Sequence, residues 1–426
     1  MYASITIALV PLAAFGLAGA VIAAGARTEC VSMAPDGAPG DGWSSRPVVS
    51  ADGRYVAFMS EATNLVPGDT NRGRDIFVEN RATRALERVS VTSEGHQAEG
   101  QSEDPAISGD GRFVAFASNA PNLAPDNPER LFHVFVHDRN TRQTERVSVA
   151  SDGTLADRHC DQPAISADGR YVAFTSWASN LAPGGAGPCA AVFLHDRTAG
   201  KTERVSAATD GTPGNDDSFW PALNADGRYV AFMSYAGNLV AGDANGVADI
   251  FVRDRVAGTI ERVSVATDGR EANAQSAWTG ISADGRLVVF ASDANNLDPS
   301  PTGGVFVRDR VAGATERVSV ATDGTPANRP TDSPAISPDG RYVAFSSGAA
   351  NLVPDDTNNR EDIFVRDCVA GTTERVSVTT DGTEADHWSR TPSISAGGRY
   401  VVFASQASNL AGRRGPQWAV FARTRE

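Results

Sequence analysis

Apolar and polar positions recur along the chain in one short pattern. In the copy that begins at Pro334, "PAISPDG" predicts a short strand that ends in a glycine turn. The next segment, "RYVAFSS", is apolar on both faces, which is typical of a strand buried between two sheets. After a polar loop, Ile363 and Val365 alternate with Phe364 and Arg366 in "DIFVRD", and the polar "TERVSVT" suits an outer strand that faces water. The pattern predicts a four-stranded antiparallel sheet.

This pattern returns with a nearly fixed period. The repeats are marked by Asp-Gly-Arg triplets 58 residues apart, with one step of 55, that begin at Asp52, Asp110, Asp168, Asp226, Asp284 and Asp339, and by a degenerate seventh at Gly397. A constant period of this length indicates an array of identical units. Four-stranded units that are buried inside and polar outside predict the blades of an all-β propeller over residues 27–426.

The ends of the chain indicate how the ring closes. The fourth-strand segment "ERVS" occurs in seven copies, of which the first, "ECVS" at Glu29, precedes every Asp-Gly-Arg triplet. No such segment follows the last repeat. We therefore predict seven blades, with the N-terminal strand completing the C-terminal blade and removing two open sheet edges.

The repeat carries a family resemblance. Ser-x-Asp-Gly-Arg-Tyr-Val-Ala-Phe followed by Asp-Ile-Phe-Val-Arg-Asp resembles the repeat of TolB-type propellers, from about residue 29 to the end of the chain. The resemblance implies a propeller that serves as a docking platform, as a lid on a peptidase or, more rarely, as an enzyme. The repeats of this chain are longer in their loops than the usual family repeat, and function usually lies in loops.

The N-terminus and the net charge restrict the setting and the partners. Residues 1–26 form an apolar run that ends in the small-x-small site Ala24-Gly25-Ala26, which predicts an export signal, with an uncleaved anchor as the alternative. The expected location is secreted or periplasmic. A net charge of −14 without a basic stripe argues against nucleic acid and anionic membranes. We expect a monomer without membrane insertion that binds a protein or a glycan.

The segment between successive blades should form the axial mouth of the ring. Two columns of this segment, eleven and eight residues before each triplet, hold polar residues that we interpret as turn and capping groups. The columns around them vary and contain aromatic and charged residues suited to recognition. The predicted binding residues are Trp43, Arg46, Asp104, His159, Asp161, Trp220, Trp278, Arg329, Asp332, His387 and Trp388. The alternative for the tryptophans is packing between neighbouring blades.

The same mouth could hold a catalytic site. His159 beside Asp161, or the acids Glu103, Asp104 and Asp332, could transfer protons, and glycoside cleavage needs paired carboxylates. TolB-like uronate lyases have a histidine-rich metal site at the mouth, and the corresponding band of this chain holds His96, His159 and His387 in different columns. We predict a non-catalytic binding propeller, without assigned catalytic residues. A polysaccharide lyase or hydrolase is the alternative.

Two further features concern metal ions and cysteines. Oxygen-bearing residues at positions one, three and seven of a loop resemble calcium loops. They are Asp69, Asn71 and Asp75; Asp243, Asn245 and Asp249; and Asp356, Asn358 and Asp362. The alternative is an Asx turn; with calcium, the protein could instead be a stiffened structural module. We also predict a disulfide between Cys160 and Cys189, which come before the first and third strands of the third blade.

Overall fold

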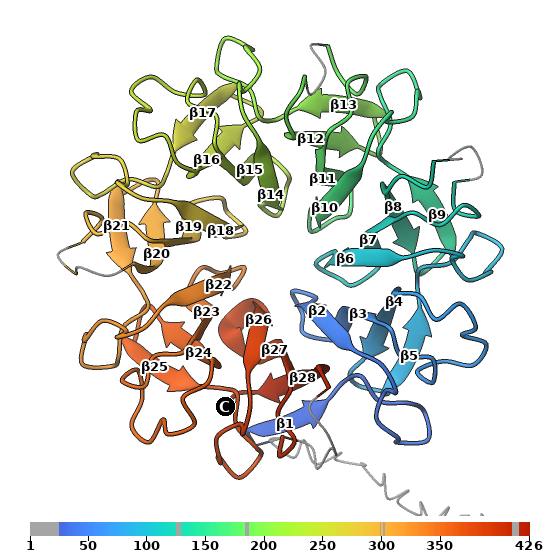
Figure 1. Ribbon diagram of the computed structural model, residues 1–426, viewed down its shortest axis with the longest axis vertical. Helices are drawn as coiled ribbons and strands as arrows, with labels where there is room; N and C mark the ends of the chain where they lie inside the picture. The colour runs from blue at the N-terminus through green and yellow to red at the C-terminus, as the bar shows by residue number, and fades with distance from the viewer. Residues whose placement is uncertain (1–24, 125–128, 184–186, 299, 301–302, 411–416) are drawn as a thin grey trace, which may run out of the picture.

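The computed structural model is a ring of seven four-stranded antiparallel sheets around a central axis (Figure 1). It describes residues 25–124, 129–183, 187–298, 300, 303–410 and 417–426. The predicted all-β, seven-bladed propeller is confirmed. The predicted export signal lies almost wholly outside the described residues. No helix among the described residues is long and apolar enough to cross a membrane.

Each blade contributes one strand to each of four concentric positions. The strands that line the axis are β2 (Ser44–Val49), β6 (Ser102–Ile107), β10 (Cys160–Ile165), β14 (Ser218–Leu223), β18 (Ser276–Ile281), β22 (Thr331–Ile336) and β26 (Ser389–Ile394). The second strands are β3 (Tyr55–Ser60), β7 (Phe113–Ser118), β11 (Tyr171–Ser176), β15 (Tyr229–Ser234), β19 (Leu287–Ser292), β23 (Tyr342–Ser347) and β27 (Tyr400–Ser405).

The third strands are β4 (Asp75–Asn80), β8 (His133–Asp138), β12 (Ala191–Asp196), β16 (Asp249–Asp254), β20 (Gly304–Asp309), β24 (Asp362–Asp367) and β28 (Ala419–Thr424). The outer strands are β5 (Ala85–Arg88), β9 (Gln143–Arg146), β13 (Lys201–Arg204), β17 (Thr259–Arg262), β21 (Ala314–Arg317), β25 (Thr372–Arg375) and β1 (Arg27–Cys30). A short 3-10 turn, η1 (Ala396–Gly398), lies in blade 7 at the turn that carries Asp-Gly-Arg in the other blades.

The ring closes as predicted. Strand β1 pairs antiparallel with β28, in the register that places Arg27 opposite Thr424 and Cys30 opposite Phe421. The N-terminal strand therefore forms the outer edge of the C-terminal blade, beside β26, β27 and β28 (Figure 1).

The core lies between blades rather than in one central mass. Each blade buries a stacked pair of phenylalanines on its second and third strands, such as Phe58 and Phe77 with ring centroids 5.9 Å apart. Each buried cluster joins residues of neighbouring blades; for example, Phe58 packs in one cluster with Val402 and Val420. Because both faces of the second strands are covered, these strands are largely apolar, as their sequence pattern indicates.

An arginine joins each of six blades to the preceding blade, and we call this unit the arginine clamp. In blade 2, the Arg139 guanidinium lies 4.1 Å from the ring centroid of Tyr55 and donates to the Gly111 carbonyl and to Glu87, each at 2.5 Å. Gly111 has φ +75°, and a Cβ there would come within 2.3 Å of the Tyr55 ring. The clamp accounts for the recurring Gly and Tyr of the Asp-Gly-Arg-Tyr segment and for the Glu of "ERVS". The clamp arginines are Arg81, Arg139, Arg197, Arg255, Arg310 and Arg425.

Candidate functional site

A β-bulge interrupts every strand that lines the axis. In β2, for example, the pairing with β3 shifts register between Ser45 and Val48. Each bulge holds a non-glycine residue with φ between 49° and 54°, namely Arg46, Asp104, Gln162, Trp220, Trp278, Ser333 and Thr391. Six of these seven residues precede a proline, which donates no backbone hydrogen bond and so suits a bulge. A non-glycine residue in this conformation costs about 1–3 kcal/mol.

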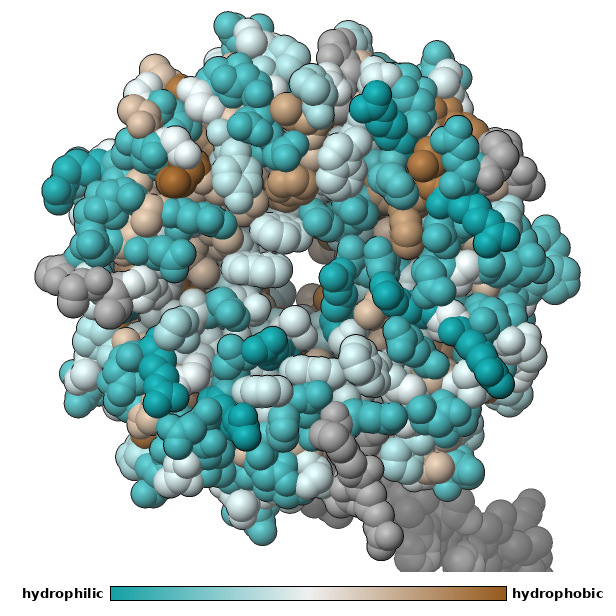
Figure 2. All heavy atoms as spheres, in the orientation of Figure 1, coloured by the Kyte–Doolittle hydropathy of each residue, from teal (hydrophilic) through white to brown (hydrophobic). Residues whose placement is uncertain are grey.

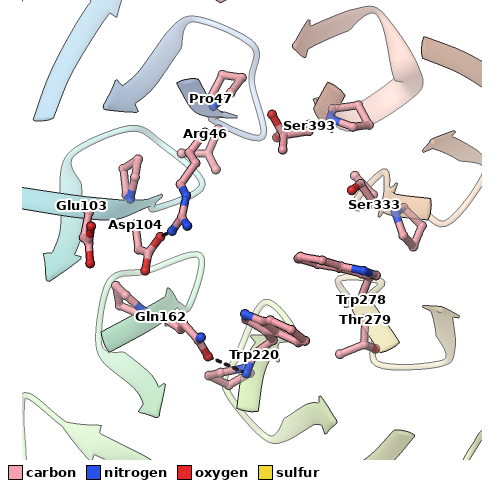
Figure 3. A pocket seen from close by; sticks show the side chains of 18 of the residues that line it. Arg46, Pro47, Glu103, Asp104, Gln162, Trp220, Trp278, Thr279, Ser333 and Ser393 are labelled. Atoms are coloured by element: carbon pink, nitrogen blue, oxygen red, sulfur yellow. Dashed lines mark hydrogen bonds and ion pairs between the residues drawn. The ribbon is translucent and has the colours of Figure 1, made fainter. Parts of the chain in front are cut away.

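The seven bulge residues surround one cavity on the axis, which we call the channel. Its volume is about 650 Å³, within the range of ligand pockets. Figure 2 shows an opening at the centre of the disc, with strongly hydrophilic side chains gathered on the side of blades 1 and 2. Figure 3 shows Arg46 and Asp104 on one side and Trp220 and Trp278 on another. Because each blade contributes a different side chain, the channel has chemically distinct sides.

Two tryptophans form the aromatic side of the channel. The indoles of Trp220 and Trp278 stack with centroids 4.5 Å apart and an interplanar angle of 16°. The Trp220 backbone N–H donates to Gln162 Oε1 at 3.0 Å, and that oxygen also accepts from Thr175 Oγ1 at 3.0 Å. Trp278 is 43% exposed, and its face away from Trp220 is open to the channel (Figure 3). The pair therefore offers a fixed aromatic surface.

The opposite side carries excess negative charge. Arg46 forms an ion pair with Asp104, and Glu103 accepts from Arg74 at 2.8 Å. Asp161 Oδ1 is buried and accepts no hydrogen bond from the described residues. Burial raises the pKa of the Asp161 carboxyl to about 6, and the neighbouring Glu103 carboxylate adds to this effect while Arg46 opposes it. A buried acceptor without a partner is costly unless a ligand or water supplies a donor.

A second cavity, the seam pocket, lies between blades 7 and 1. Its volume is about 350 Å³. It is lined by Trp43, Ser45, Arg46, Met59, Glu61, Arg74, Arg390, Thr391, Ala404 and Trp418. Arg46 and Thr391 also line the channel, so the two cavities adjoin. The seam pocket combines an apolar floor with guanidinium groups.

The predicted binding residues separate into three groups. Arg46, Asp104, Asp161, Trp220 and Trp278 line the channel. Trp43 lines the seam pocket, whereas the rest do not line either cavity; they are His159, Arg329, Asp332, His387 and Trp388.

The residues outside the cavities have local partners. His159 Nδ1 accepts from the Phe132 N–H at 3.2 Å, and Asp332 accepts from Ser346 Oγ. Trp388 lies beneath Arg360, with the guanidinium carbon 5.0 Å from the indole centroid. These contacts leave the three side chains with fewer groups that could bind a ligand.

Several lining residues were missed. They are Gln162, Ser333, Thr391 and Trp418. The first three stand six residues before the repeat marker, in the same column as Arg46 and Trp220. That column, with the proline that usually follows it, is the signal that could have identified them, because a common backbone conformation directs all seven side chains to the axis.

The two polar columns belong to the frame, as the sequence indicated. Ser44 Oγ bonds Ser60 Oγ at 2.8 Å inside blade 1, and Asp41 Oδ1 accepts from the Thr63 N–H at 2.6 Å. These bonds tie the segment between blades to the end of the second strand and to the loop that follows it. The frame holds the mouth in place independently of what the variable columns carry.

The histidines of the mouth do not form a metal centre. None of the described residues that line the channel is a histidine. His159 and His387 each use Nδ1 to accept a backbone N–H, from Phe132 and Trp388 respectively. Among the described residues, one group of three His, Cys, Asp or Glu residues has ligand atoms within 4.8 Å of one another: Cys189, Asp216 and Asp217. The residues therefore do not fit the histidine-rich site that the family resemblance implies.

The predicted calcium loops are organised around an arginine. In blade 4, Arg262 Nη1 lies 3.2 Å from Asp243 Oδ1 and 3.6 Å from Asp249 Oδ2. Asn245 Oδ1 accepts from the Val247 N–H at 3.0 Å, which is an Asx turn. In blades 1 and 6, Arg88 and Arg375 approach the corresponding acids. These contacts support the Asx-turn alternative, because the guanidinium already supplies positive charge; calcium stays a prediction.

The predicted disulfide is wrong. Cys160 and Cys189 are both free thiols. Cys160 takes the place of a frame serine, and its Sγ lies 3.1 Å from Ser176 Oγ inside blade 3. Cys189 Sγ instead contacts the Asn215 carbonyl at 3.8 Å. Strand β11 separates β10 from β12 in the sheet, so the two thiols point to different neighbours.

Comparison with known proteins places the chain by its fold. No protein-family model and no curated protein matches it. An oligogalacturonate lyase in complex with manganese is similar with a TM-score of 0.56 and 12% identity, over 94% of this chain and 97% of that one. The β-propeller domain of the Trilobed protease from Pyrococcus furiosus gives 0.55 and 12%, over 89% and 95%. TolB from Acinetobacter baumannii gives 0.44 and 15%, over 79% of this chain and 64% of that one. At these identities the likeness shows the fold alone: the chain is a seven-bladed β-propeller, consistent with the TolB-type repeat predicted from its sequence.

Proposed function

We propose that this protein is a binding propeller that holds a segment of a protein or a glycan in its channel without chemical change, outside the cytoplasm. The observation that carries the proposal is the ring of seven non-glycine residues with positive φ, whose side chains all line one cavity. Glycine would adopt this conformation without strain. Retaining costly side chains at these positions is expected where the side chains have a function.

The contents of the channel also support binding. A stacked tryptophan pair presents a rigid aromatic surface, and tryptophan is enriched among residues that dominate binding energy. Gln162 holds the Trp220 backbone in position before any ligand arrives. A site that is already ordered loses little conformational entropy on binding.

A polysaccharide-active enzyme is the second candidate. One observation favours it: the unpaired Asp161 carboxyl has its pKa raised to about 6 and lies near Glu103, which is an arrangement suited to proton transfer. One structural neighbour is an oligogalacturonate lyase. The charge of the channel argues against a polyanionic substrate, because the carboxylates of Glu103, Asp104 and Asp161 outnumber the one guanidinium, that of Arg46.

The proposal can be tested with displayed random peptides and a glycan array. Ligands retained by the wild type should be lost by Trp278→Ala, because that variant removes the open aromatic face. Val256→Ala is the matched control: Val256 is 77% exposed in the turn between β16 and β17, at the far end of the blade from the mouth. Retention of the same ligands by Trp278→Ala would refute the proposal. A mass change in a bound ligand would instead favour the enzyme.

A further inference from the structure

The channel has a carboxylate without a positively charged partner. Arg46 is paired with Asp104 and Arg74 with Glu103, whereas Asp161 Oδ1 has no hydrogen-bond partner among the described residues. Burying such an acceptor is unfavourable until a donor reaches it, and a positively charged donor compensates most. The charge of this cavity therefore favours a cation.

The frame of the protein shows how it holds a cation elsewhere. In each arginine clamp, a guanidinium stacks on an aromatic ring and, in five of the six, also donates to a glutamate. In blade 4, Arg255 lies 4.5 Å from the Tyr171 centroid and donates to Glu203 at 2.5 Å. The channel is lined by Trp278 and by Asp161, whose Oδ1 has no hydrogen-bond partner among the described residues. The described guanidiniums that stack on a tryptophan, those of Arg360 and Arg390, both lie over Trp388 and not over Trp278. Tryptophan gives the strongest cation–π contacts.

We infer that the channel ligand is a peptide segment with a basic side chain, arginine or lysine, that stacks on the open face of Trp278 and directs its charge toward Glu103, Asp104 and Asp161. An apolar side chain of the same segment fills the seam pocket. This inference rests on the proposed function and names the class of ligand that the proposed site takes.

The seam pocket is the reason for choosing a peptide over an amino sugar. Trp43, Met59 and Trp418 give this pocket a large apolar surface, and it adjoins the channel through Arg46 and Thr391. A peptide can place a basic side chain in one cavity and a leucine or phenylalanine in the next. A sugar carries no comparable apolar group, so it would leave the seam pocket unfilled.

The experiment uses blocked peptides of the form acetyl-Arg-(Gly)n-Leu-amide, with one to three glycines, titrated into the full-length protein by calorimetry. Citrulline in place of arginine keeps the shape and removes the charge. We expect citrulline to weaken binding about tenfold or more, since a desolvated cation–π contact and a charge-assisted hydrogen bond are both lost. Glycine in place of leucine should also weaken binding.

Variants of the protein locate the effect. Asp161→Asn keeps the shape of the side chain and removes an unpaired buried charge, so folding is preserved, and it should lose about tenfold in affinity for the arginine peptide but little for the citrulline peptide. Trp278→Ala should weaken both, and Val256→Ala should change neither. Thermal melting confirms that each variant is folded.

Equal binding of the arginine and citrulline peptides would overturn the inference. Tighter binding of a glucosamine oligomer than of every arginine peptide would overturn it as well. If displayed ligands depend on Trp278 but lack basic residues, this inference fails while the proposed binding function stands. If no ligand depends on Trp278, both fail.

Discussion

The junction between blades 5 and 6 lacks the arginine clamp, and restoring the clamp should stabilise the protein. Cys368 stands where the other blades have the clamp arginine, and Leu287 stands where they have an aromatic ring. The backbone is equivalent, since the Cys368 N–H donates to the Arg341 carbonyl at 2.9 Å as that of Arg139 does to Arg112 at 3.0 Å. The prediction is that Cys368→Arg with Leu287→Tyr rebuilds the unit.

The magnitude follows from the contacts of an intact clamp. Stacking of Arg139 on Tyr55 at 4.1 Å corresponds to about 1 kcal/mol at a partly exposed site. The charge-assisted bond to the glycine carbonyl contributes about 1.5 kcal/mol before side-chain entropy is subtracted. The ion pair contributes about 0.5 kcal/mol, because its glutamate is 47% exposed. The double variant should therefore gain about 2 kcal/mol in free energy of unfolding.

Urea unfolding of the wild type, both single variants and the double variant forms a double-mutant cycle. Leu287→Tyr alone should be close to neutral, and Cys368→Arg alone should gain about 1 kcal/mol from the carbonyl bond and from Glu316, which has no ion pair among the described residues. The coupling between the two substitutions should be about 1 kcal/mol and should persist in high salt, unlike the ion-pair part. The same cycle with Tyr55→Leu and Arg139→Cys is the matched control at an intact junction. A coupling below about 0.3 kcal/mol would refute the stacking argument.

Three further predictions concern binding, the calcium-like loops and ring closure. Because the pKa of Asp161 is raised to about 6 and a cation prefers the ionised carboxylate, affinity for the arginine peptide should rise as the pH increases through 6 and level off above it. The charged groups that act on Asp161 are Glu103 and Arg46, and Asp161→Asn should flatten the profile; a flat wild-type profile would contradict the assignment. Arg262→Met should lower the free energy of unfolding by about 3 kcal/mol, since the carboxylates of Asp243, Asp249 and Glu271 lose their cation. Restoration by added Ca²⁺ would support calcium binding, whereas a wild-type melting temperature lowered by EDTA would show that the arginine does not suffice. Removing residues 1–32 should lower the melting temperature and cause association through the exposed edge of β28, and an added peptide of residues 25–33 should reverse both. An unchanged monomer would show that closure contributes nothing.

The fold was predictable from the sequence because the same pattern of strands occurs in seven repeats. One repeat fixes four strands, and the extra "ECVS" at the start fixes how the ring closes. The clamp shows why the motifs persist: Gly111 leaves space for the Tyr55 ring, and Arg139 needs both the ring and Glu87. The recurrent Gly, Tyr, Arg and Glu make contacts between blades, whereas Asp110 and Arg112 make contacts within their own blade.

The site was predictable only in part. The variable columns identified Trp220, Trp278 and Asp161. The sequence did not show which residues of these columns line the channel, because this depends on a bulge that rotates one residue of each blade toward the axis. Gln162 was missed since an amide among charged and aromatic residues did not stand out. The disulfide failed for a similar reason: the distance along the strand says nothing of the side chain's direction, and Cys160 points into its blade.

A belt of backbone hydrogen bonds joins the Asp-Gly-Arg turns at the face of the ring opposite the mouth. The turn of each blade donates an N–H to the next turn, as Ala51 does to Gly109 at 3.0 Å, until Pro338, which has no N–H to give. There Asp339 Oδ2 accepts from Gly397 instead, at 3.1 Å. Since the backbones of the seven blades are equivalent, moving Gln162, Trp220 and Trp278 together to the corresponding positions of other blades would turn the recognition surface about the axis in steps of one blade. The direction in which the recognition surface faces can thus be changed by exchanging side chains, without changing the backbone of the ring.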